Sequence, residues 1–142
     1  MIDLSGEGRV ALSTGIDLIE IHRIAKAVDR FGDRFLNRIY TAGEIRYSRG
    51  RIPELAVRFA AKEAVTKAIG TGLRGVRWRD IEVINDRRGK PHILLHGGAA
   101  ARAERIGLNH FAVSLTHSVE LGAAFVVASR QPDADATQRP SG

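Results

Sequence analysis

The sequence predicts an α+β fold, in which a mainly antiparallel sheet packs against a long central helix. Two observations lead to this fold class. Short apolar runs with the composition of strands lie near both ends of the 142-residue chain, and helical segments separate them. The longest helical segment, near the middle, is rich in alanine, whose small side chain lets other backbone approach closely. Strands and helices in this order favour an antiparallel sheet.

The first elements follow from apolar runs and from helix-capping residues. Val10–Ile21 is apolar and β-branched around Gly15, as expected of a buried strand, and a helix is expected over Arg23–Phe31. Gly32 interrupts the helical pattern. Thr41-Ala-Gly-Glu44 has the spacing of a capping box, in which the threonine oxygen and the glutamate carboxylate satisfy free N–H groups at the start of a helix.

The central helix is expected over Pro53–Ile69. Pro53 suits the first turn, where its missing N–H group costs nothing, and Gly70 suits the C-terminal end. Beyond it we expect two strands joined by the turn Asp86–Gly89, then a helix, then two strands joined through Thr116–Gly122. The strands are predicted over Trp78–Ile84, His92–His96, Phe111–Leu115 and Ala123–Ala128, and the helix over Gly97–Ile106.

Length and composition limit the classes of protein. A single domain is expected over residues 1–129, whereas residues 130–142 lack large apolar groups and are expected to form a disordered tail. Because the chain has no cysteine, disulfide scaffolds, thiol nucleophiles, cysteine-ligated zinc and iron–sulfur clusters are excluded. No apolar run approaches the ~18 residues of a membrane span, and residues 1–9 do not resemble a signal peptide. We therefore expect a cytoplasmic domain with no membrane partner.

The positive charge is concentrated in one part of the chain. The net charge is +6, and residues 21–51 alone carry +5. Five basic residues in this segment recur at steps of three and four, which would put them on one side if the segment were one helix. Gly32 interrupts it, so one unbroken row is not expected. The five residues are Arg23, Lys26, Arg30, Arg34 and Arg38. The row is either a solvated helix face or a docking surface for nucleic acid, membrane phosphate or an acidic protein.

Asp17 is the first candidate for chemistry. It follows Gly15 and Ile16 in an otherwise apolar stretch. A carboxylate at the end of a buried strand is costly unless it is paired or binds a cation. Asp17 is therefore interpreted as a helix N-cap, a partner for an arginine or a metal ligand.

The central helix carries a second set of candidates: Arg58, Lys62, Glu63 and Lys67. Glu63 and Lys67 are four residues apart and could form an ordinary helix ion pair. The functional alternative is magnesium, which takes one or two carboxylates and completes its shell with water and substrate phosphates. Asp17 and Glu63 would supply the carboxylates, and the three basic side chains would counter phosphate charge.

A third set follows a predicted strand, in Val113-Ser-Leu-Thr-His117-Ser118. Hydroxyl groups and a histidine at a strand end are more often structural, and nothing here resembles the nucleophile elbow of a serine hydrolase. Gly70–Gly75 could cradle phosphate, although it follows a helix instead of preceding one. The other histidines have no metal-ligand spacing; they are His22, His92, His96 and His110.

Together these segments resemble the holo-acyl-carrier-protein synthases of the 4′-phosphopantetheinyl transferase superfamily. The resemblance rests on an ordered set of motifs that covers residues 10–128. The set comprises Gly15-Ile-Asp17-Leu-Ile-Glu-Ile-His-Arg23-Ile, Arg58-Phe-Ala-Ala-Lys62-Glu63-Ala-Val-Thr-Lys67-Ala, Gly70-Thr-Gly72, Trp78-Arg-Asp80-Ile-Glu-Val, Asp86-Arg-Arg-Gly89-Lys-Pro91 and Val113-Ser-Leu-Thr-His117. Residues 1–9 and the tail match nothing in the family. The resemblance implies the fold of that superfamily.

The resemblance also implies a reaction. The phosphopantetheine arm of coenzyme A would pass to a serine of an acyl carrier protein in fatty acid biosynthesis, with release of adenosine 3′,5′-bisphosphate. Asp17 and Glu63 would hold Mg²⁺, and Glu63, with Lys67 nearby, would deprotonate the serine. Coenzyme A would contact Arg58, Lys62, Gly72, Ser114, Thr116 and His117. The acidic carrier would dock on Arg23, Lys26, Arg30 and Arg34.

The same resemblance implies an assembly. Longer relatives resemble two fused copies, with the Ser-x-x-His motif of one half facing the carboxylates of the other half. This chain has one copy of each motif, so a homotrimer is implied, with His117 acting in the site of a neighbouring copy. One rival interpretation is a small basic module that binds nucleic acid, which would leave Asp17 and Glu63 unexplained. Another is an enzyme that modifies a different acidic carrier.

Overall fold

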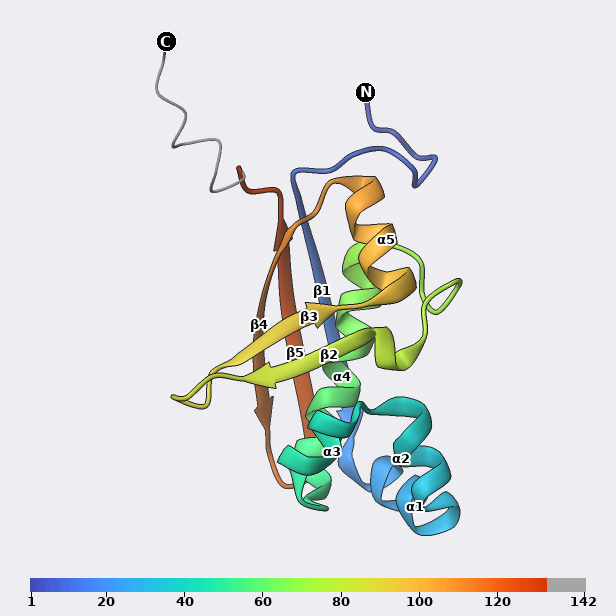
Figure 1. Ribbon diagram of the computed structural model, residues 1–142, viewed down its shortest axis with the longest axis vertical. Coiled ribbons are helices and arrows are strands. Elements are labelled where there is room, and N and C mark those ends of the chain that lie inside the picture. The colour runs from blue at the N-terminus through green and yellow to red at the C-terminus, as the bar shows by residue number, and fades with distance from the viewer. Residues whose placement is uncertain (133–142) are drawn as a thin grey trace.

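The strands form two antiparallel sheets, one on each side of helix α4 (Ile52–Ile69), which runs through the middle of the molecule (Figure 1). The computed structural model describes residues 1–132. The strands are β1 (Leu12–Glu20), β2 (Ile81–Asn85), β3 (Pro91–Leu95), β4 (His110–His117) and β5 (Leu121–Ser129). One sheet has the order β1-β5-β4 and the other is the β2–β3 hairpin. The predicted α+β class is confirmed, with two sheets in place of one.

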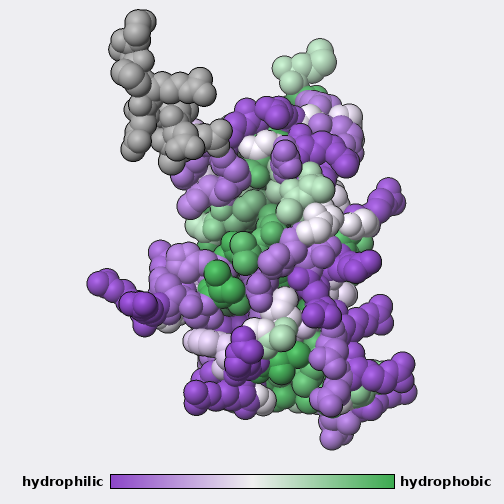
Figure 2. All heavy atoms as spheres, viewed as in Figure 1, coloured by the Kyte–Doolittle hydropathy of each residue, from purple (hydrophilic) through white to green (hydrophobic). Residues whose placement is uncertain are grey.

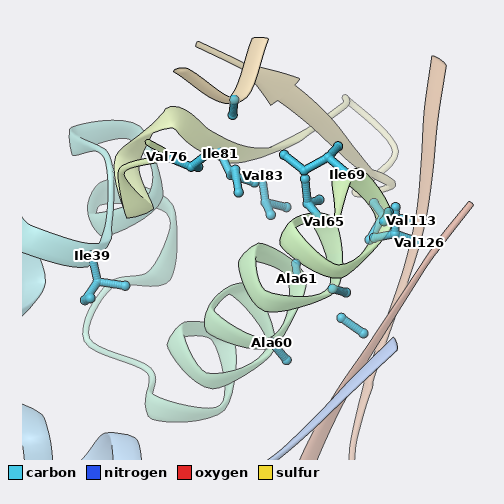
Figure 3. Close-up of a cluster of buried hydrophobic side chains, with 14 of the residues drawn as sticks. Ile39, Ala60, Ala61, Val65, Ile69, Val76, Ile81, Val83, Val113 and Val126 are labelled. Atoms are coloured by element: carbon cyan, nitrogen blue, oxygen red, sulfur yellow. The ribbon is translucent and has the colours of Figure 1, made fainter. Parts of the chain in front are cut away.

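The alanine-rich sequence of α4 explains its central place. Alanine has a high helix propensity and adds little bulk, so neighbouring elements can pack closely on several sides of the helix. Figure 3 shows Ile81 and Val83 of the hairpin on one side of α4, and Val113 and Val126 of the other sheet on a second side. The core is therefore continuous across the helix, which holds both sheets at fixed positions.

Most helix ends lie at or near the residues that the sequence indicates. The remaining helices are α1 (Ile21–Phe31), α2 (Asp33–Ile39), α3 (Ala42–Ser48) and α5 (Gly97–Ile106). Helix α1 begins two residues before the predicted Arg23, and α2 was not predicted. Pro53 lies in the first turn of α4, and Gly70 ends that helix with a φ of 76°. Gly32, with a φ of 55°, separates α1 from α2. Thr41 and Glu44 form the predicted capping box at the start of α3.

Some boundaries differ from the prediction. Trp78–Asp80 form a 3₁₀ turn, η1, instead of the start of a strand, because the Asp80 carboxylate accepts the N–H of Arg77 at 2.9 Å and closes a turn. Strands β4 and β5 extend to His117 and Leu121, which shortens the loop between them. Residues 133–142 of the predicted tail lie outside the described residues. Among residues 1–132, no helix is long and apolar enough to cross a membrane.

Candidate active site

Two carboxylates meet where β1 crosses α4. Gly15 permits this contact, because a Cβ at its position would lie 1.8 Å from the carbonyl oxygen of Ala64. Asp17 follows two residues later and so lies on the same face of β1. Glu63 immediately precedes Ala64 on α4, and it lies near enough to Asp17 for the charge of Asp17 to raise its pKa. The close approach of strand and helix therefore brings the two predicted metal ligands together.

Lys67 lies in the same group. Its Nζ donates to Asp17 Oδ1 at 3.2 Å and to the carbonyl oxygen of Ile16 at 2.8 Å. Partial burial raises the pKa of Glu63, the nearby charge of Asp17 raises it further, and Lys67 opposes this change. The two carboxylates are thus a partly buried pair of like charges that one lysine leaves incompletely neutralised. Such a pair favours the binding of a cation.

The ligand set indicates which cation fits. Within residues 1–132, no group of three or more histidine, cysteine, aspartate or glutamate side chains is placed to hold a metal ion. Zinc sites usually need three or four protein ligands, whereas magnesium is bound by one or two carboxylates together with water and substrate phosphates. Asp17 and Glu63 therefore fit a magnesium ion that is shared with a phosphorylated substrate.

The raised pKa of Glu63 predicts a stability effect. Since the folded pKa lies above that of the unfolded chain, ionised Glu63 destabilises the fold near neutral pH, and the penalty disappears as the pH falls below the ordinary glutamate pKa. Glu63→Gln is expected to raise the Tm by about 1–3 °C near neutral pH and to leave it unchanged near pH 4. Thermal unfolding of both proteins at both pH values, with exposed Glu104→Gln as control, measures this; a lower Tm for Glu63→Gln near neutral pH would contradict it.

A second group of predicted residues lines a cavity of about 400 Å³ beside β4. Ser114, Thr116 and His117 come from the strand, and Arg58 comes from α4. Hydroxyl, imidazole and guanidinium groups are all suited to hydrogen bonding with an anion. The cavity therefore has the polar groups that a phosphate-bearing ligand requires.

Arg58 is held rigidly in the wall of this cavity. Its guanidinium donates to Glu54 Oε2 at 2.7 Å and to Asn85 Oδ1 at 2.6 Å. Its central carbon lies 4.6 Å from the centre of the Tyr47 ring. The residue is buried, and its Nε has no hydrogen-bond partner among the described residues. An anion near Arg58 would thus meet a guanidinium that is already oriented.

The other lining residues include three polar ones that were not predicted as site residues: Tyr47, Asn85 and Lys90. Lys90 lies inside the motif Asp86–Pro91, which contributes to the family resemblance but to which no role in the site was assigned. Asn85 adjoins that motif, and its amide donates to the carbonyl oxygen of Gly89 at 3.0 Å, which holds the hairpin turn. Only the motif could have indicated these two, and no sequence signal indicated Tyr47.

Lys62 is a correction to the predicted site. Its side chain has no exposed surface, and its Nζ lies 2.7 Å from Glu44 Oε1. It also donates to the carbonyl oxygens of Trp78 and Ile81. The predicted contact with coenzyme A phosphates is therefore wrong, because the ammonium faces α3 and β2 inside the core.

The remaining predicted residues are accessible. Gly72 lies in the loop after α4 and adopts a φ of 57°, which favours glycine. The predicted docking residues are exposed on α1 and α2: Arg23, Lys26, Arg30 and Arg34.

The carboxylates and the cavity lie apart within one chain. Asp17 pairs with Ala124 of β5, and Ala124 pairs with Leu115 of β4, so β5 separates Asp17 from the Ser114–His117 segment. Two strand spacings amount to about 10 Å. Among the described residues that line the cavity, Asp17 and Glu63 are absent. One chain therefore presents two separate groups of predicted site residues, which we call half-sites.

Known proteins share this arrangement of sequence and fold. A sequence model described as the 4′-phosphopantetheinyl transferase superfamily matches residues 13–126, which include Asp17, Glu63 and His117. This chain belongs to that superfamily. The match confirms the resemblance that the ordered motifs indicate, and with it an enzyme of the phosphopantetheinyl transferase class.

Curated and solved members of the superfamily are similar over nearly their whole length. The holo-[acyl-carrier-protein] synthase of Solibacter usitatus is 52% identical over 120 residues, 82% of this chain and 96% of the relative. The crystal structure of the Helicobacter pylori synthase in complex with coenzyme A has a TM-score of 0.76 at 30% identity, covering 82% of this chain and 99% of that one. The Bacillus anthracis synthase in complex with CoA (3′,5′-ADP) has a TM-score of 0.70 at 36% identity, covering 86% and 100%.

Proposed function

We propose that the chain transfers the 4′-phosphopantetheine group of coenzyme A to a serine of an apo acyl carrier protein, with Mg²⁺, and releases adenosine 3′,5′-bisphosphate. Family membership and the named relatives support the transferase reaction. The meeting of Asp17 and Glu63 beside Lys67 is the observation that supports the metal-dependent chemistry. The rival nucleic-acid module explains neither carboxylate.

Three side chains bind the metal, accept the proton of the carrier serine and offset the charge of the coenzyme A phosphates: Asp17, Glu63 and Lys67. Asp17 and Glu63 would hold Mg²⁺, which would supply a Lewis acid for the attacked phosphate and a template for the leaving group. Glu63 accepts the proton of the carrier serine. The serine oxygen then forms a bond to phosphorus as the bond to the nucleotide phosphate breaks. Lys67, half exposed, keeps Asp17 in place and faces the phosphates with its charge.

The cavity beside β4 suits the nucleotide end of coenzyme A. The buried Arg58 would attract the phosphate groups through its charge in the cavity wall, and Ser114, Thr116 and His117 would contact the 3′-phosphate. Gly72, whose backbone is free of a side chain, allows the pyrophosphate to approach the loop after α4. In this assignment the nucleotide and the reacting phosphorus occupy different half-sites.

The outer face of the β1-β5-β4 sheet supports a homotrimer that joins these half-sites. Large apolar side chains on this face are exposed in the single chain: Leu12 (64%), Ile16 (63%), Leu18 (64%) and Phe125 (45%). A contiguous exposed apolar face marks an interaction surface. We infer that a second copy covers this face and that its Ser114–His117 segment completes the site at the carboxylates of β1 and α4, so that each active site takes residues from two chains.

Transfer and its metal dependence are tested together by mass spectrometry. An apo acyl carrier protein incubated with coenzyme A, this chain and Mg²⁺ is expected to gain one phosphopantetheine group. With EDTA the rate is expected to fall at least about a hundredfold, because the phosphate charge is no longer stabilised. No mass gain under either condition, together with salt-sensitive DNA binding, would contradict the proposal and favour the nucleic-acid module.

A further inference from the structure

A groove outside both half-sites lies between α2–α3 and the segment that follows α4. Its volume is about 880 Å³. Arg38 lines one wall, Arg77 and Arg79 line the other, and Leu73 and Trp78 contribute its apolar surface. None of these residues has a role in the reaction described above.

The cations of this groove have no anionic partner, whereas its anions are occupied. Arg38, Arg77 and Arg79 are exposed, and none of the three forms a salt bridge within residues 1–132. The carboxylate of Asp80 accepts the Arg77 N–H at 2.9 Å. Glu82 accepts the Thr41 hydroxyl at 2.5 Å and lies 3.1 Å from His96 Nε2. The lining carries three arginines against the carboxylates of Asp80 and Glu82, so an incoming acidic surface would meet a wall of net positive charge.

The apolar part of the groove is firmly supported. The Trp78 ring stacks on Phe59 of α4, with ring centroids 4.8 Å apart and planes inclined by 25°. Leu73 is 41% exposed beside it. An apolar strip between basic walls is complementary to an acidic, amphipathic helix. Figure 2 shows hydrophilic side chains over much of the visible face of the molecule, with hydrophobic patches between them.

The groove continues the predicted docking row. Arg34 and Arg38 are four residues apart on α2 and share one helix face, so the α2 part of the docking row adjoins the groove wall that Arg38 lines. Leu73 belongs to the loop that follows α4, next to the end of the helix that carries Lys67. A macromolecule that fills the groove would therefore sit against the catalytic end of α4.

We propose that this groove, through Arg38, Arg77 and Arg79, is a second docking surface for the acidic carrier protein. The proposal rests on the proposed function and adds to the α1–α2 row an apolar strip and two arginines from a different part of the chain. The carrier would then contact α1, α2 and the segment that follows α4 while its serine reaches Glu63.

The double variant Arg77→Glu/Arg79→Glu tests this surface. Its KM for apo carrier is expected to rise about tenfold, because two attractive charges become repulsive. The kcat and the KM for coenzyme A are expected to stay within about twofold of wild type, since a rim charge acts mainly on encounter. The matched control is Arg87→Glu/Arg88→Glu, which places the same charge change at the exposed tip of the β2–β3 hairpin.

The outcomes separate this proposal from the proposed function. An unchanged carrier KM, or an equal rise in the hairpin control, would contradict the proposal that the carrier binds this groove. Neither result would affect the proposed transferase reaction. Wild-type protein that modifies no carrier would overturn the proposed function itself. Added salt is expected to raise the carrier KM of wild type more steeply than that of the groove variant; equal salt dependence would also contradict the groove. A matching thermal unfolding curve shows that the variant is folded.

Discussion

Lys62→Met is expected to lower the free energy of unfolding by about 3–5 kcal/mol, because it leaves the buried Glu44 carboxylate without its cation. The two side chains have no exposed surface, and Lys62 Nζ lies 2.7 Å from Glu44 Oε1. Burial lowers the pKa of Lys62, and the charge of Glu44 partly offsets this change. Methionine has a similar length, so the loss of charge dominates over the loss of volume.

The effect is expected to be large because Glu44 connects three elements. Its carboxylate accepts the Thr41 N–H at 2.9 Å in the capping box of α3 and the Val83 N–H of β2 at 3.1 Å. Lys62 brings α4 to the same point. An unpaired charge at this junction has to be protonated, hydrated or moved, and each alternative loosens the contact between α4 and the hairpin.

The double variant Lys62→Met/Glu44→Gln separates charge from packing. Glutamine keeps the capping box but removes the uncompensated charge, so it is expected to restore about 2 kcal/mol of the loss. Urea denaturation of the wild type, the single variant and the double variant measures this. A single variant that loses less than about 1 kcal/mol of unfolding free energy, or a double variant no more stable than the single one, would contradict this account. It would show that the Lys62–Glu44 pair does not stabilise the contact between α3, α4 and β2.

Local signals predicted the elements well. The capping box at Thr41–Glu44, Pro53 at the start of α4 and Gly70 at its end depend on neighbours within a few residues, so the sequence displays them directly. The 3₁₀ turn at Trp78–Asp80 was missed because it leads directly into the β-branched strand Ile81–Asn85, and the side chain that closes it is a single aspartate.

Contacts between distant parts of the chain were harder to predict. Lys62 lies in the same motif as Glu63, but its partner Glu44 is 18 residues away and decides that it points into the core. Arg58 meets Asn85 across 27 residues. Helical spacing gives the side of a helix on which a residue lies; it does not say which element covers that side. Packing between elements therefore divides one basic run of the helix into core and site residues.

Asp17→Ala and His117→Ala are each expected to lower kcat/KM for coenzyme A at least about a hundredfold. The Asp17→Ala variant would lose a metal ligand beside Glu63 and Lys67. The His117→Ala variant would lose a contact with coenzyme A in the cavity beside β4. Each single variant damages a different half-site, which makes the pair informative about how the active site is assembled.

Mixing the two variants tests the central claim that neighbouring chains share each active site. In a homotrimer with random subunit exchange, a site is intact when a His117→Ala chain supplies Asp17 and its neighbour, an Asp17→Ala chain, supplies His117. An equal mixture is then expected to recover about one quarter of wild-type activity, measured as carrier modification after exchange has been verified with labelled chains. Activity that stays at the level of the single variants would contradict the shared site.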